Sequence, residues 1–151
     1  MIERVRAIVL TPNNTILTIK RTKPGTPPYW VLPGGHTDEG DSTLEDALRR
    51  ELREELGGDA TIQRLIEVIH KENERQYFYL ATMESWSFAD RTGPEFLEPG
   101  RGTYELEEIP CNADAAAAID LKPSEIATFI GNALSGAGGL AALPDLRERA
   151  V

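Results

Sequence analysis

The chain has 151 residues, a size that predicts one domain built around one hydrophobic core. Its formal net charge of −9 argues against a general nucleic-acid-binding protein, because phosphates attract lysine and arginine. No run of residues approaches the roughly 20 apolar residues that span a bilayer, so we expect no membrane partner. A single cysteine, Cys111, and a charged N-terminus without an export signal indicate a cytoplasmic protein.

The first third of the chain has the pattern of a strand-rich segment. Strands are predicted at residues 1–10, 15–21 and 29–33. Residues 22–28 are rich in proline and glycine, so we expect a loop there. Gly34 and Gly35 follow the third strand, where they let the backbone turn tightly or approach a ligand closely.

Residues 43–56 carry the strongest helical pattern of the chain. Leucines repeat at four-residue spacing, at Leu44, Leu48, Leu52 and Leu56. We expect Ser42 to cap the helix N-terminus, with Glu45 three residues later completing a capping box. Gly57 is expected to end the helix.

The second half of the chain continues the alternation of strands and helices. Strands are predicted at residues 61–71, 75–83 and 103–110, the first two as a hairpin, and a helix at residues 123–134. This order predicts an α/β fold, a mixed β-sheet with helices packed on both faces. We expect one domain at residues 1–136, followed by a tail at 137–151 that is either mobile or docked on the partner subunit of a homodimer.

Three glutamates lie close together at the end of the first helix. A helix turns by about 100° per residue, which places Glu51, Glu54 and Glu55 within an arc of roughly 100°. Leu44 and Leu48 occupy the same arc one or two turns earlier, so the apolar stripe becomes a carboxylate stripe. Such a cluster either faces water, with neighbouring arginines giving surface ion pairs, or binds a cation such as Mg²⁺.

The segment "GGHTDEGDSTLEDALRRELREELG" at residues 34–57 resembles the signature of the Nudix hydrolases, a superfamily that includes MutT-type pyrophosphohydrolases. The second half, from Arg50 to Gly57, matches at every specified position. Three departures are visible. Asp41 stands where the family has glutamate, one residue is added between Asp41 and Arg50, and Gly58 replaces an apolar residue. The resemblance implies a Nudix-type α/β/α sandwich.

The resemblance also implies roles for the matching residues. Glu51, Glu54 and Glu55 are similar to the family's ligands for Mg²⁺ or Mn²⁺, and Arg50 to the residue that orients these carboxylates. The carbonyl of Gly34 or Gly35 is similar to a backbone metal ligand of some members. The implied activity is metal-dependent hydrolysis of a nucleoside diphosphate linked to a group X, by attack of water on phosphorus.

The general base and the substrate contacts stay open at this level. In the family the base is a signature glutamate or one from a later loop. Glu95, in a loop about 40 residues beyond Glu55, is our candidate, against the alternative of a solvated loop carboxylate. Arg21 is a candidate for phosphate binding and Tyr29 for stacking on a base, although surface and core roles are the common alternatives. Gly35 is expected to contact the substrate. The competing function is a nucleotide-binding Nudix module without catalysis.

Overall fold

The computed structural model describes residues 1–87 and 102–149. Its strands are β1 (Ile2–Leu10), β2 (Thr15–Lys23), β3 (Thr26–Val31), β4 (Gly34–His36), β5 (Thr61–Lys71), β6 (Glu74–Thr82), β7 (Thr103–Pro110) and β8 (Leu121–Lys122). Its helices are α1 (Leu44–Leu56), α2 (Ala113–Ala117) and α3 (Ser124–Ser135), followed by the 3₁₀ turns η3 (Gly139–Ala142) and η4 (Leu146–Arg149). Among these described ranges, no helix is long and apolar enough to cross a membrane.

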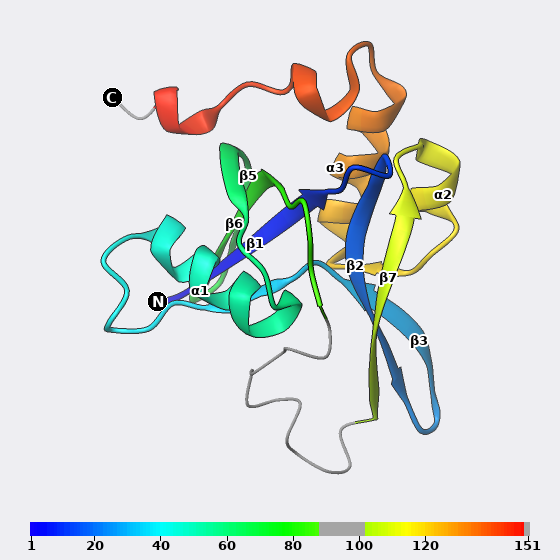
Figure 1. Ribbon diagram of the computed structural model, residues 1–151, viewed down its shortest axis with the longest axis horizontal. Helices are drawn as coiled ribbons and strands as arrows, with labels where there is room; N and C mark the ends of the chain where they lie inside the picture. The colour runs from blue at the N-terminus through cyan, green and yellow to red at the C-terminus, as the bar shows by residue number, and fades with distance from the viewer. Residues whose placement is uncertain (88–101, 150–151) are drawn as a thin grey trace.

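The strands form one mixed sheet, in the order β5-β6-β1-β2-β3-β8, with β4 beside β1 and β7 beside β2. Strands β1 and β6 run parallel, whereas β1 pairs antiparallel with β2 only at Val9 and Leu10. The other half of β1 pairs with the short β4 instead. The sheet therefore divides between β1 and β2 (Figure 1). Gly34 and Gly35 of β4, called the glycine turn below, lie beside β1 at this division.

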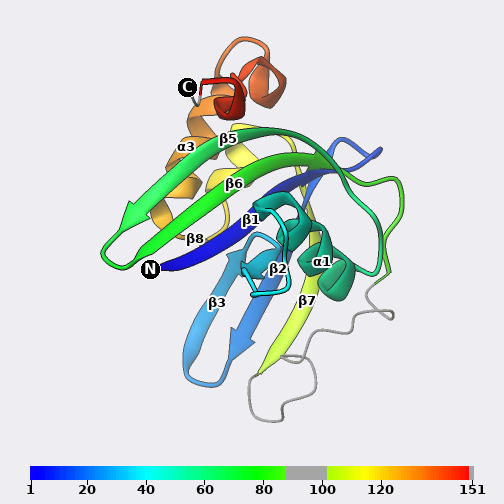
Figure 2. The same ribbon diagram turned by 90° about the vertical axis from the view of Figure 1, so that its left-hand side faces the viewer.

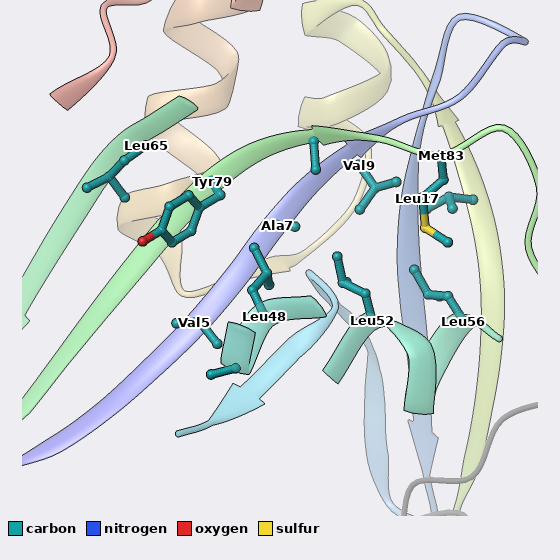
Figure 3. Close-up of a cluster of buried hydrophobic side chains, with 12 residues drawn as sticks. Val5, Ala7, Val9, Leu17, Leu48, Leu52, Leu56, Leu65, Tyr79 and Met83 are labelled. Atoms are coloured by element: carbon teal, nitrogen blue, oxygen red, sulfur yellow. The ribbon is translucent and has the colours of Figure 1, made fainter. Parts of the chain in front are cut away.

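Helices cover both faces of the sheet, as predicted: α1 lies on one face, and α2 and α3 lie on the other (Figure 2). Alternation along β1 explains this, because Val5, Ala7 and Val9 point to the α1 face while Ile8 points to the α3 face. Leu48, Leu52 and Leu56 of α1 are fully buried against the first group (Figure 3). Burial of each leucine contributes about 1.5–3 kcal/mol, which fixes how α1 lies on the sheet.

The start of α1 differs from the prediction. Thr43, not Ser42, is the N-cap, because its hydroxyl accepts the backbone N–H of Asp46 at 3.0 Å. Glu45 does not close a capping box, since its carboxylate pairs with Arg147 of the tail. The predicted end of the helix is confirmed, with Gly57 in the left-handed conformation.

The predicted loop at residues 22–28 is mostly strand. Strand β2 continues to Lys23, and β3 begins at Thr26, so only a tight turn at Gly25, with a positive φ of 74°, separates them. The prolines at 27 and 28 are tolerated because the neighbouring β8 pairs only with Trp30 and Val31. The short elements α2 and β8 were not predicted, since neither has enough residues to show a periodic pattern.

The tail folds back along the outer edge of β5 (Figure 1). Arg64 donates to the carbonyls of Ala141 and Leu143, at 3.0 and 2.7 Å. The N–H of Leu65 donates to the Asp145 carboxylate at 3.1 Å. The described part of the tail is thus docked on its own domain, where it covers an edge strand that would otherwise expose unpaired backbone groups.

Candidate active site

Two of the predicted glutamates, Glu51 and Glu54, line a cavity of about 390 Å³ between α1 and the glycine turn. Their side chains are 13% and 30% exposed. The remaining lining residues are Arg4, Arg6, Gly34, Gly35, His36, Asp38 and Arg50. The cavity therefore combines carboxylates from the helix with arginines from β1, a mixture suited to a cation and an anion bound together.

The glycine turn requires glycine for two different reasons. Gly34 has φ of 144°, and a Cβ there would lie 2.0 Å from the carbonyl oxygen of Val5. Gly35 has no such backbone conflict, but its Cβ would lie 2.7 Å from the carboxylate of Glu51. The first glycine thus lets the chain pass close to β1, and the second leaves room for a carboxylate of the candidate site.

Glu55 lies deeper than the other two glutamates and is 6% exposed. Its Oε1 accepts the backbone N–H of Gly34 at 2.7 Å, which connects α1 to the glycine turn. Burial lowers the pKa of Arg6, while the nearby carboxylate of Glu55 acts in the opposite direction. Glu55 is not among the residues lining the cavity, and its role as a metal ligand stays a prediction.

Arg50 holds the acidic residues of the signature in place. Its guanidinium donates to both oxygens of Asp41, at 3.1 and 3.0 Å, and to the backbone carbonyl of His36 at 3.1 Å. It also lies 3.1 Å from Glu51 and 3.5 Å from Glu54. The hydrogen bonds with Asp41 raise the pKa of Arg50 and lower the pKa of Asp41. Asp41, where this chain departs from the family pattern, therefore anchors the arginine.

The donor set fits a hard divalent cation with few protein ligands. In residues 1–87 and 102–149 no group of three or more Asp, Glu, His or Cys side chains is arranged to hold a metal ion. Mg²⁺ is commonly held by only one or two carboxylates, with waters and substrate phosphates completing its six oxygens. Glu51 and Glu54 supply such a pair, and their cavity has room for the remaining oxygens.

The other predicted substrate residues lie outside this cavity. Arg21 of β2 stacks on Tyr104, with its guanidinium carbon 3.9 Å from the ring centroid, and lies 5.8 Å from the ring of Tyr29. The structure thus brings Arg21 and Tyr29 together but does not place either beside Glu51 or Glu54. Glu95 lies outside the described residues.

The sequence reasoning missed the arginines of β1. Arg4 and Arg6 both line the cavity, and Arg6 also donates to the carbonyl of Leu32 at 3.1 Å. A signal was present, because two basic residues alternate with apolar ones in "ERVRAIVL" and must share one face of a strand. The sequence did not show that this face lies beside the carboxylates of α1.

A second cavity, of about 440 Å³, lies on the other side of Arg6. Its walls come from β6, β8, the end of β5 and the start of α3. Arg6 lines both cavities, so its side chain lies between them.

Comparison with known proteins agrees with this arrangement. The family model described as the NUDIX domain matches residues 1–123. A Bacillus subtilis protein named "Putative 8-oxo-dGTP diphosphatase" is 35% identical over 100 residues, 62% of this chain and 64% of that protein. The nucleoside triphosphatase NudI of Escherichia fergusonii is 40% identical over 53 residues, 35% of this chain and 37% of that protein.

The fold is similar to solved structures as well. A hydrolase of the NUDIX family from Clostridium perfringens superposes with a TM-score of 0.61 at 19% identity, over 88% of this chain and 95% of that chain. The chain spans less than two thirds of the length of the two curated relatives that it matches. The match over residues 1–123, together with the signature helix and its glycine turn, shows that the chain belongs to the Nudix family.

Proposed function

We propose that the protein is an Mg²⁺-dependent pyrophosphohydrolase that cleaves the diphosphate linkage of a nucleotide substrate. One observation carries this proposal: Glu51 and Glu54 line the same cavity as Arg4 and Arg6. The carboxylates suit a divalent cation, and the arginines suit the phosphates that the cation would neutralise. The names of the two curated relatives support nucleoside triphosphates, including 8-oxo-dGTP, as substrates.

Each residue of the cavity has a defined part in this proposal. Glu51 and Glu54 would hold Mg²⁺, which when bound supplies charge neutralisation and a water of lowered pKa. Arg6 and Arg4 bind and orient the substrate phosphates. Arg50, held by its hydrogen bonds to Asp41, keeps Glu51 in position through a hydrogen bond and Glu54 through an ion pair at 3.5 Å. Most of the catalytic effect then comes from positioning and electrostatics.

A general base is still required to take the proton of the attacking water. Glu95 is our proposed base, with Glu54 as the alternative within the described cavity. Replacement of Glu95 by Gln separates the two, because loss of the base lowers kcat and removes its pKa from the pH–rate profile.

Release of phosphate or pyrophosphate from a panel of nucleotides, with and without Mg²⁺, tests the proposal. Glu54→Gln is expected to lower kcat about 100-fold, because it removes a charge that stabilises the transition state. Glu72→Gln is the matched control, since Glu72 is exposed in the β5–β6 turn, away from the cavity. Tight nucleotide binding without any turnover would instead indicate a binding module.

A further inference from the structure

Arg4, an arginine of the cavity that Glu51 and Glu54 line, is held by a carboxylate from the neighbouring strand. Glu74, the first residue of β6, accepts a hydrogen bond from Arg4 Nε with its Oε1. Its Oε2 accepts a hydrogen bond from the Gln76 amide at 3.1 Å. Strand register brings the three together, because Gln76 pairs with Arg4 and Glu74 lies two residues earlier, on the same face. Both oxygens of Glu74 are thus engaged, which fixes the position of its carboxylate.

The pair of Arg4 and Glu74 is only partly open to water. Their side chains are 27% and 22% exposed. The hydrogen bond from Arg4 lowers the pKa of Glu74, so this carboxylate stays ionised at neutral pH. A charge-assisted hydrogen bond of this kind restricts the guanidinium more than a fully exposed ion pair does. Arg4 is therefore held in place before any ligand binds.

This contact leaves most donors of Arg4 for other partners. A guanidinium has five N–H donors in a planar fork, and the hydrogen bond to Glu74 uses the one on Nε. The other four are on the two terminal nitrogens, at the end of the side chain. Because Arg4 lines the cavity, this end is suited to the oxygens of a phosphate bound there.

Glu74 also offsets the repulsion between the two arginines of β1. Arg4 and Arg6 are two residues apart and share one face of the strand. Burial lowers the pKa of Arg6, the charge of Arg4 adds to this effect, and the carboxylate of Glu74 acts against it. Without Glu74, repulsion would favour orientations of Arg4 that turn away from Arg6 and from the cavity.

We propose that Glu74 is a positioning residue, which holds the Arg4 guanidinium where it binds a substrate phosphate. This inference rests on the proposed function and adds to it a residue outside the lining of the cavity. Glu74 orders Arg4 in advance, so the complex does not lose the freedom of a long side chain on binding. The contribution is to substrate affinity, because Glu74 acts through Arg4 and does not touch the reacting atoms.

Steady-state kinetics with a nucleoside triphosphate and Mg²⁺ tests this role. Glu74→Gln retains the shape of the side chain but removes its charge. It is expected to raise KM about fivefold, the effect of freeing one long side chain, and to change kcat by less than about twofold. Glu45→Gln is the matched control and should keep the wild-type KM. Glu45 also pairs with an arginine, Arg147, and is 30% exposed, but neither residue lines the cavity.

A double-mutant cycle shows whether Glu74 acts through Arg4. Arg4→Ala alone is expected to raise KM about tenfold, because it removes a charge-assisted contact with phosphate. In that background Glu74→Gln should cause no further rise, since there is no guanidinium left to hold. Glu74→Asp retains the charge on a shorter side chain and should give a KM between those of the wild type and Glu74→Gln.

Three results would overturn the inference. An unchanged KM in Glu74→Gln, with a lower melting temperature, would show that the pair only connects β1 to β6. A lower KM would show that Glu74 weakens phosphate binding by neutralising Arg4. A rise of the same size in the Arg4→Ala background would show that Glu74 acts by another route.

Calorimetric binding of methylenediphosphonate separates this inference from the proposed function. This pyrophosphate analogue is not hydrolysed, because carbon replaces its bridging oxygen. Weaker binding to Glu74→Gln than to the wild type, without turnover of any nucleotide by the wild type, would refute the proposed function and support the role of Glu74. Turnover by the wild type, with equal affinity of the two proteins for the analogue, would do the reverse.

Discussion

At the scale of single residues, the close packing of the backbone at Gly34 and Gly35 decides which side chains fit in the site. Gly34 allows the turn to pass β1, and its N–H holds the buried carboxylate of Glu55. Gly35 leaves the space that the Glu51 carboxylate occupies. Asp41 holds Arg50 through two hydrogen bonds, so an aspartate serves here although the signature specifies glutamate.

The two glycines are expected to respond differently to alanine. Gly34→Ala conflicts with the backbone of Val5 at a positive φ, and should lower the free energy of unfolding by about 3 kcal/mol. Gly35→Ala displaces the flexible Glu51 carboxylate, and should lower kcat at least about tenfold while changing stability by less than about 1 kcal/mol.

Denaturant unfolding and steady-state kinetics of both variants measure these effects. Gly40→Ala is the control, because a Cβ at Gly40 meets nothing within 4 Å. A Gly35→Ala protein with wild-type kcat would show that the position of Glu51 does not matter for the reaction.

At the scale of elements, helix α1 and the tail are connected through Arg147. Its guanidinium contacts Asp145 at 2.7 Å, Glu45 of α1 at 2.6 Å and the Gln63 carbonyl of β5 at 2.6 Å. This arginine lowers the pKa of Asp145 to about 2. The tail is therefore held on β5 and α1 by charge-assisted hydrogen bonds as well as by apolar contacts.

The stability that Asp145 contributes is expected to depend on pH. Its folded-state pKa of about 2 lies below the ordinary value of 3.8, so the contribution is complete above about pH 4 and is lost as pH falls toward 2. Asp145→Asn should cost about 1 kcal/mol at pH 7, and the difference from wild type should shrink between pH 4 and pH 2.5.

Urea unfolding at several pH values measures the Asp145 contribution. Asp59→Asn removes a surface pair with Arg53, in which Asp59 is 86% exposed, and should change stability little at any pH. If the Asp145→Asn difference stays constant down to pH 2.5, ionisation of Asp145 does not hold the tail.

At the scale of the whole molecule, the divided sheet places Arg6 between two cavities. Strands β1 and β2 pair at only two positions, and the gap between them exposes Arg6 to a cavity on either side. Helix α1 lies over one face and α3 over the other, so the two cavities are built from opposite layers (Figure 2).

Mg²⁺ held by Glu51 and Glu54 is expected to stabilise the folded protein. A ligand that binds only the folded state adds about 2.7 kcal/mol at a concentration of about 100 times its Kd. Thermal unfolding with Mg²⁺ should shift to higher temperature, and EDTA should reverse the shift. The double variant Glu51→Gln, Glu54→Gln should show no shift, with Na⁺ at equal ionic strength as the control for general salt effects. An equal shift in this variant would place the ion elsewhere.

Much of the fold could be predicted from local pattern. The strands at β1, β5, β6 and β7 and the helices α1 and α3 have clear periodicity, because each buries one face against the core. The N-cap was predicted wrongly, because Ser42 and Thr43 are adjacent and both residue types are common N-caps. The β2–β3 hairpin was predicted wrongly, because a proline-rich strand has the composition of a loop.

The sequence by itself determined the family, the signature helix and the carboxylates that face one way on it, because these are properties of spacing along one element. Only the tertiary structure decided that Glu55 serves the glycine turn while Glu51 and Glu54 face the cavity. It also decided that Arg6 lines two cavities. These relations join segments up to about 120 residues apart, and contacts across such distances depend on strand order and packing, which no local pattern specifies.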